Sequence, residues 1–172
     1  MKTSLILFLV LFTGRIMAQS NTESYPIDPD SEEQAGIPKG EILKFTFANS
    51  KIFPGTSREI SVYVPAQYKA DKPACVYVNQ DGIQWKAPTV FDNLIAKKKM
   101  PVSIGVFVTP GKVLAQRTEA GDRFNRSFEY DGLGGNYARF LLDEVFPFVE
   151  SQKATDGRVL RLSKNGNDRA IG

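Results

Sequence analysis

Apolar and polar residues alternate along two early stretches of the chain. Residues 41–49 and 57–68 both follow the period of two that is typical of half-buried strands. A Pro-Gly pair at 54–55 lies between the stretches and signals a turn. The pattern predicts two antiparallel strands joined by a short connection.

Later stretches alternate between two other patterns. Residues 74–80 and 101–111 are nearly continuous apolar runs, as buried strands are. Residues 88–100 and 136–152 repeat apolar positions at the 3–4 spacing of helices, and Pro147 should distort the second helix. Strands that alternate with helices after an opening antiparallel pair predict an α/β layered sheet, mostly parallel beyond its first two strands.

The last residues of the sequence resemble the start of another strand. Asp168 and Arg169 lead into Ala170-Ile171-Gly172, a short apolar stretch. We expect this stretch to begin a buried strand of the same sheet.

The first 40 residues divide into two segments of different composition. Residues 1–18 have a basic start, a short apolar run and small residues at the end, which predicts a secretory signal peptide and an exported protein. An anchor helix that is retained is the alternative. Residues 19–40 are polar, acidic and rich in Pro and Gly, which predicts a flexible lead-in. The folded domain is therefore expected over residues 41–172, with no membrane span after signal cleavage.

The charge of the chain argues against polyanionic partners. The formal net charge is +3, and two of the positive residues, Lys2 and Arg15, lie in the predicted leader. The rest of the chain is close to neutral, so we expect it to bind neither nucleic acid nor an anionic membrane.

The sequence contains no histidine and one cysteine, Cys75. Serine hydrolases need an imidazole to take the proton of the nucleophile, and zinc sites usually need one as a ligand. Cys75 lies in an apolar run and is expected to pack in the core. As printed, the chain cannot hold a Ser-His-Asp triad, and we expect neither a metal nor a cofactor.

Asp81, Gly82 and Ile83 follow the apolar run 74–80 directly. In open α/β sheets, ligands bind beyond the carboxyl ends of the strands. The three residues therefore either line a pocket, with a free backbone N–H at Ile83, or form an ordinary turn.

Residues 121–137 form a long segment that is dense in charged and aromatic residues. Arg126 and Glu129 are close enough in sequence to pair with each other. The glycines at 132–135 do not fit the dinucleotide-binding pattern, because Tyr137 occupies the position of its last glycine. The residues of this segment by themselves predict a structural loop that fixes the next helix.

Several of these stretches together resemble one family. They are "REISVYVPAQY", "VYVNQDGIQW", "MPVSIGVFVTPG", "RFNRSFEY", "YARFLLDEVFPFVE" and "DRAIG". Their order is similar to the N-terminal half of the esterase branch of the α/β-hydrolases, which includes enterochelin esterase-like and feruloyl esterase-like proteins. The resemblance covers residues 41–172 and implies the N-terminal portion of a three-layer sandwich. Some members of the most similar subgroup are labelled as gluconolactonases or carry a lactonase-like domain.

The resemblance also implies roles for individual residues. In this family the stretch that matches Arg169-Ala170-Ile171 leads along the central strand into the nucleophile elbow G-x-S-x-G, so the serine is expected just after Gly172, and the acid and histidine later. No catalytic residue then lies in this chain. Ile83 would give one backbone N–H to the oxyanion hole, and Asp81 and Gly82 would shape its loop.

Four more assignments follow from the resemblance. Trp85 would line the substrate cleft, and Arg126, Glu129 and Tyr130 would support the site without taking part in bond chemistry. The full-length protein would be an exported serine esterase, periplasmic or extracellular, acting on a small-molecule or carbohydrate ester, and the 172-residue chain would be an inactive fragment. The alternatives are a secreted gluconolactonase-type enzyme with a lactonase-like domain downstream, and a non-catalytic truncated module.

Overall fold

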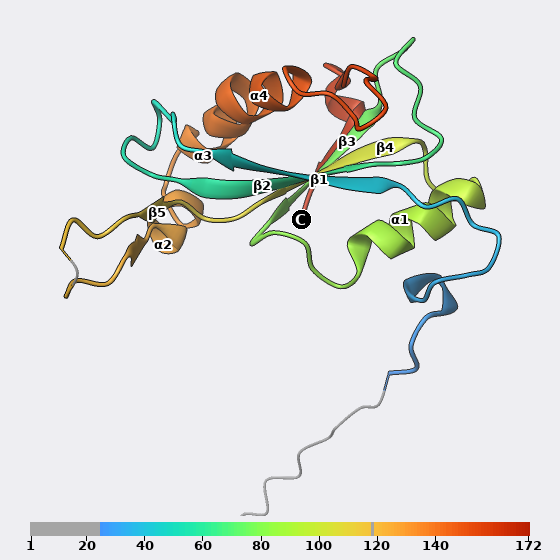
Figure 1. Cartoon of the computed structure of the whole chain (residues 1–172), viewed down its shortest axis with the longest axis horizontal. Helices are drawn as coiled ribbons and strands as arrows, with labels where there is room; N and C mark the ends of the chain where they lie inside the picture. Colours follow the sequence, from blue (N-terminus) through green and yellow to red (C-terminus); the bar gives the residue numbers. More distant parts are fainter. Residues whose placement is uncertain (1–24, 118) are drawn as a thin grey trace, which may run out of the picture.

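The protein is described here from a computed structural model that covers residues 25–117 and 119–172. Its centre is a five-stranded sheet with the strand order β1-β2-β4-β3-β7 (Figure 1). The strands are β1 (Glu41–Phe47), β2 (Arg58–Val64), β3 (Cys75–Gln80), β4 (Ser103–Val108) and β7 (Arg169–Ile171).

The strand directions match the sequence prediction. β1 is antiparallel to β2, and β2 is antiparallel to β4. β3 then lies parallel to both β4 and β7. The two parallel connections each cross over through helical segments, as parallel strands require. The mixed α/β class is thus confirmed, with antiparallel strands first and parallel strands after them.

Helices cover both faces of the sheet (Figure 1). Helix α1 (Ala87–Ala96) lies on one face, where Phe91 and Ile95 pack against Tyr63 and Phe107. On the other face lies one longer helical stretch, formed by α3 (Asn136–Arg139), the π-helical segment η2 (Phe140–Val145) and α4 (Phe146–Glu150). Because strand side chains alternate between faces, β2, β3 and β4 contribute to both apolar cores, whereas β1 contributes to the core under the longer helical stretch.

The π-helical segment has a local cause in the sequence. Pro147 lies two residues after its last residue, Val145, and has no N–H to donate to the preceding turn. The proline ring also clashes with the carbonyl four residues earlier, so a wider turn relieves the contact. The predicted distortion is therefore present, and it takes the form of a π turn within a continuous helical stretch.

The segment between β4 and α3 contains short elements. β5 (Lys112–Val113) pairs with β6 (Arg123–Phe124), and α2 (Arg126–Tyr130) follows immediately. The described part of the chain also has two 3-10 turns: η1 (Pro29–Ser31), which precedes β1, and η3 (Gly166–Asp168), which precedes β7.

Two features of the ends differ from expectation. The described part of the lead-in, residues 25–40, is not free of the domain, because it contacts α1 through η1. Composition alone does not reveal this attachment. Among the described residues, strand β7 pairs with β3 and with no other strand, and its Ile171 is 58% exposed rather than buried. The predicted signal peptide, residues 1–18, lies outside the described residues.

No helix within residues 25–117 and 119–172 has both the length and the apolar character needed to cross a bilayer.

Candidate functional site

The carboxyl ends of three parallel strands meet at one edge of the sheet. β3 ends at Gln80 and β4 at Val108, and these two residues are register partners. Gly172, which follows β7, accepts a hydrogen bond from the Gln80 N–H at 3.1 Å and donates one to the Val78 carbonyl at 3.0 Å. The residues after β3 and after β7 are therefore neighbours, at the edge where α/β sheets bind ligands.

The loop between β3 and α1, residues 81–86, has an unusual backbone. Asp81, Trp85 and Lys86 have positive φ angles of 61°, 44° and 53°, and Gly82 has one of 78°. Such conformations are costly for residues other than glycine and persist only when the surroundings hold them. Strained non-glycine residues of this kind concentrate at functional sites, which favours a functional role of this loop over an ordinary turn.

Contacts from the sheet fix the first half of the loop. Asn79 is buried, and its side-chain amide donates to the Gly82 carbonyl at 2.9 Å. The Gly82 N–H donates to the Val108 carbonyl at 3.2 Å. Within the described residues, the next N–H along the chain, that of Ile83, makes no hydrogen bond. A fixed and unbonded N–H at this edge is the kind of group that can stabilise a developing oxyanion.

Asp81 is bound from the side by helix α2. Arg126 Nε donates to Asp81 Oδ1 at 2.8 Å and Arg126 Nη2 to Asp81 Oδ2 at 2.6 Å, a bidentate ion pair. The Asp81 N–H also donates to the hydroxyl oxygen of Tyr130 at 3.2 Å. The hydrogen bond from Arg126 lowers the pKa of the Asp81 carboxyl, while burial raises the pKa of Tyr130. Asp81 is therefore ionised and held in one orientation at neutral pH.

Glu129 has a different partner from the one its position in the sequence suggests. It does not pair with Arg126; its carboxylate accepts two hydrogen bonds from Arg58 on β2, at 2.7 and 3.1 Å. Both side chains of this ion pair are 0% exposed. Glu129 also accepts from the Gly111 N–H at 3.1 Å, after β4. The predicted Arg126–Glu129 pair was wrong because the two side chains leave α2 toward different parts of the protein.

Aromatic rings enclose the buried ion pair. The Arg58 guanidinium lies 4.3 Å from the centroid of Phe140 and 5.7 Å from that of Phe53. Arg58 Nη2 also donates to the Thr56 hydroxyl at 2.7 Å. The pair ties α2 to β2 and to the loop after β4, and α2 in turn presents Arg126 and Tyr130 to the loop at Asp81.

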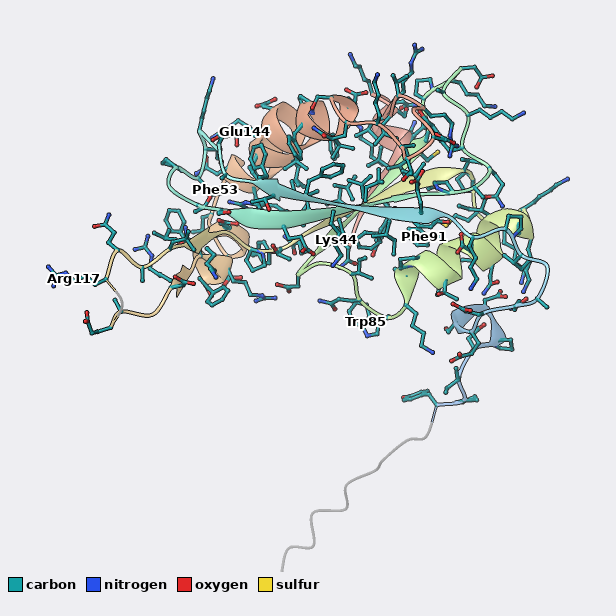
Figure 2. All side chains as sticks on the ribbon, in the orientation of Figure 1. Lys44, Phe53, Trp85, Phe91, Arg117 and Glu144 are labelled. Carbon is teal, nitrogen blue, oxygen red and sulfur yellow. The ribbon has the colours of Figure 1, made fainter. Side chains whose placement is uncertain are left out.

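The structure therefore brings together most of the residues predicted for the site. Asp81, Gly82 and Ile83 form the loop, and Arg126 and Tyr130 contact it. Glu129 does not contact the loop; it binds Arg58 and Gly111 and so holds helix α2, which carries Arg126 and Tyr130. Trp85 lies at the far end of the loop with 81% of its surface exposed, on the α1 side of the sheet (Figure 2).

Sequence reasoning missed two residues of this arrangement, Arg58 and Asn79. Arg58 is the first residue of an alternating strand, where the sequence predicts an exposed side chain. Its partner, Glu129, lies 71 residues further along the chain. Asn79 is a polar residue inside an apolar run, which was a usable signal, because such a residue needs buried hydrogen-bond partners. Residues 25–117 and 119–172 contain no group of three or more His, Cys, Asp or Glu side chains arranged to hold a metal ion.

The class of protein follows from these observations together. An antiparallel pair, then a parallel sheet with helices on both faces and a strained loop after its third strand, define an α/β-hydrolase-like domain. The profile of the family described as "Putative esterase" matches residues 50–163. The chain belongs to this esterase family.

Solved structures have the same fold. A ferulic acid esterase from the anaerobic fungus Anaeromyces mucronatus, solved without substrate, aligns with a TM-score of 0.58 and 19% identity over 85% of this chain and 53% of its own. A mutant of the feruloyl esterase module from Clostridium thermocellum, complexed with sinapinate, aligns with a TM-score of 0.52 and 17% identity over 86% of this chain and 48% of its own. The chain thus spans about half the length of these structures. No curated protein gave a match.

Proposed function

We propose that this chain is the oxyanion-loop half of an exported serine carboxylic-ester hydrolase. The nucleophilic serine, the acid and the histidine would then follow residue 172. Membership of the esterase family supports ester hydrolysis, and the half-length alignment supports a continuation of the domain. The absence of histidine from the 172 residues agrees with this division, because the base of such an enzyme comes late in the chain. The leader pattern of residues 1–18 supports export to the periplasm or the medium.

The unbonded N–H of Ile83 is the observation that carries this proposal. It lies in a loop whose start is held by Arg126 and Tyr130, and this loop follows Gln80, the residue whose N–H donates to the Gly172 carbonyl. In the proposed reaction a serine hydroxyl attacks the ester carbonyl and gives its proton to the histidine. The carbonyl oxygen becomes an oxyanion that accepts a hydrogen bond from Ile83. The alcohol leaves with that proton, and water then releases the acid from the acyl-enzyme.

The proposed substrate is an ester of a small aromatic acid, on a small-molecule or carbohydrate alcohol. Support comes from the two neighbours described above, one a ferulic acid esterase and the other a feruloyl esterase module bound to sinapinate. In this proposal Trp85, which is exposed at the end of the oxyanion loop, contacts the aromatic acyl group.

The first test is to read the coding sequence beyond residue 172. A G-x-S-x-G elbow within a few residues, followed later by a histidine, is the expected result. A stop codon directly after residue 172 would rule out catalysis by this chain.

The second test addresses Ile83 in the full-length product, with methyl ferulate and p-nitrophenyl acetate as substrates. Ile83→Pro removes the backbone N–H and should lower kcat by about 10²–10³-fold, as loss of one oxyanion donor does. Ile83→Val changes the side chain but keeps the N–H, so it should retain most of the activity. Equal activities in the two variants, with both folded by circular dichroism, would contradict the assignment of Ile83.

A further inference from the structure

Residues 28–40, here called the N-terminal strap, lie along helix α1 (Figure 1). The buried Asn93 side chain donates to the carbonyls of Asp30 and Glu32, both at 2.9 Å. The Gly40 N–H donates to Asp92 at 2.8 Å. A segment with polar, disorder-prone composition is therefore bound to the domain by buried side-chain groups of α1.

Charged contacts extend this attachment to both ends of the helix. Asp30 forms ion pairs with Lys97 and, at 3.6 Å, with Lys99, beyond the C-terminal end of α1. At the other end, Glu32 Oε1 lies 2.6 Å from Lys86 Nζ. Lys86 is both the N-cap residue of α1 and the last residue of the loop 81–86.

The loop is thus held by an ion pair at each end. Arg126 binds Asp81 at its start, and Glu32 binds Lys86 at its end. Lys86 adopts a left-handed conformation, and its side chain makes no capping hydrogen bond to the helix, although its carbonyl accepts a hydrogen bond from the Val90 N–H at 3.1 Å. The contact with Glu32 is a restraint on Lys86 that comes from outside the loop and its helix.

We propose that Glu32 is a positioning residue for the oxyanion loop, and that the strap acts through Lys86 to set the direction of the Ile83 N–H. This inference rests on the proposed function of Ile83. An oxyanion donor is effective only when its orientation is fixed before the reaction, because reorganisation during the reaction costs rate. Anchors on both sides of Ile83 meet this need, since a loop held at one end alone can pivot about it.

If the ion pair between Glu32 and Lys86 only stabilised the fold, its loss would shift the unfolding transition. Exposed ion pairs contribute little to global stability, so we expect the unfolding transition to stay nearly unchanged when this one is lost. The local order of the loop should change instead. Two hydrogen bonds report on it: that of the Ala87 N–H to the Gln84 carbonyl at 2.9 Å, and that of the Gly82 N–H to Val108.

The experiment compares Glu32→Gln with Glu33→Gln in the full-length protein. Glu33 is the matched control, because its ion pair with Lys39, at 2.7 Å, stays within the strap. Hydrogen exchange at the Ala87 amide should become about two- to fivefold faster in E32Q, the range expected for loss of one exposed ion pair, and stay unchanged in E33Q. The charge swap E32K/K86E should restore slow exchange. With methyl ferulate, kcat should fall by a similar factor in E32Q while KM stays constant.

The two readouts separate this inference from the proposed function. Exchange is measured in every variant, whether or not the protein hydrolyses the ester. If the unsubstituted protein hydrolyses no ester, the proposed function fails and exchange alone judges whether Glu32 orders the loop. Equal exchange in E32Q and E33Q would overturn the inference, and so would an unchanged kcat in an active protein whose loop exchange had increased.

Discussion

Glu129 occupies the most demanding electrostatic environment among the residues around the loop. It shares a fully buried ion pair with Arg58 and accepts a third hydrogen bond from Gly111. Replacement of one partner in such a pair leaves the other charge buried and uncompensated, which costs about 3–5 kcal/mol. We therefore expect Glu129→Gln to lower the free energy of unfolding by an amount in that range, measured by urea denaturation.

An exposed pair in the same protein provides the control. Glu59 lies 3.5 Å from Lys44, and both side chains are about half exposed or more. Glu59→Gln should cost no more than about 1 kcal/mol. If the two glutamine variants unfold at the same urea concentration, the Arg58–Glu129 pair does not stabilise the fold in the way its burial indicates.

Asp81 gives a prediction about pH. Its hydrogen bond from Arg126 lowers its pKa below the ordinary value of 3.8. A carboxyl whose pKa is lower in the folded state contributes stability that is present above 3.8 and is lost as the pH falls through the folded value. The ion pair should therefore persist down to pH 4 and break only in stronger acid. Titration of the Asp81 carboxyl carbon by NMR measures this directly.

Arg126→Gln is the companion variant for that titration. It removes the charge and the bidentate contact, so the Asp81 pKa should rise toward 3.8. Arg123→Gln, on exposed β6 without an ion pair among the described residues, should leave it unchanged. A parent protein in which Asp81 already titrates at 3.8 would contradict the ion pair.

At the scale of elements, the sequence predicted each main strand and helix, because their signals are local. The apolar run 74–80 and the helical spacing of 136–152 show which faces of each element are buried. This pattern lies within the segment itself, so the element can be predicted without knowledge of its partners. The attachment of residues 25–40 to α1 was not predicted, since it depends on two polar residues, Asp92 and Asn93, that look solvated on an isolated helix. Only the folded arrangement places strap carbonyls and N–H groups opposite them.

The candidate site also has a part that the sequence predicted and a part that it did not. The loop after β3 could be located from the end of an apolar run, and the residue types of α2 pointed to a supporting role. The partners of that support could not be read from the sequence, because Arg58 and Glu129 are far apart along the chain and Arg126 and Glu129 are three residues apart. Helical spacing allows the local pair, and only the tertiary fold selects the distant one.

Gly111 shows how closely β2, α2 and the loop after β4 approach one another. A Cβ atom added there would collide with Glu129 Oε1 and lie 2.7 Å from Arg58 Nη2. Gly111→Ala must therefore displace the buried ion pair. We expect it to destabilise the protein by at least the 1–3 kcal/mol or so that overpacking costs, measured by thermal or urea unfolding.

Gly121→Ala is the matched control, because a Cβ atom there meets nothing within 4 Å and its backbone angle suits any residue. It should change the free energy of unfolding by no more than about 0.5 kcal/mol. A tolerated Gly111→Ala would mean that the three elements can separate without loss of stability.

At the scale of the whole molecule, one flank of the sheet is less covered than the rest. β7 pairs with β3 on one side and with no strand of the described residues on the other. Beside it lies a hollow of about 270 Å³ whose lining is largely apolar, including Tyr137, Leu141, Phe146 and Ile171. An unpaired strand next to an apolar hollow is a surface that favours association with another chain.

The 172-residue chain, produced by itself, should therefore self-associate through this flank. Ile171→Lys places a charge on the exposed edge, where charged side chains oppose edge-to-edge pairing. We expect sedimentation velocity to show less association for this variant than for the unsubstituted chain at equal concentration. Ile27→Lys adds the same charge to an exposed residue of the N-terminal segment, far from β7 in sequence and outside the hollow, so it should leave association unchanged. If both lysine variants reduce association equally, net charge and not the β7 edge governs it. If the unsubstituted chain is monomeric, the flank is not an association surface.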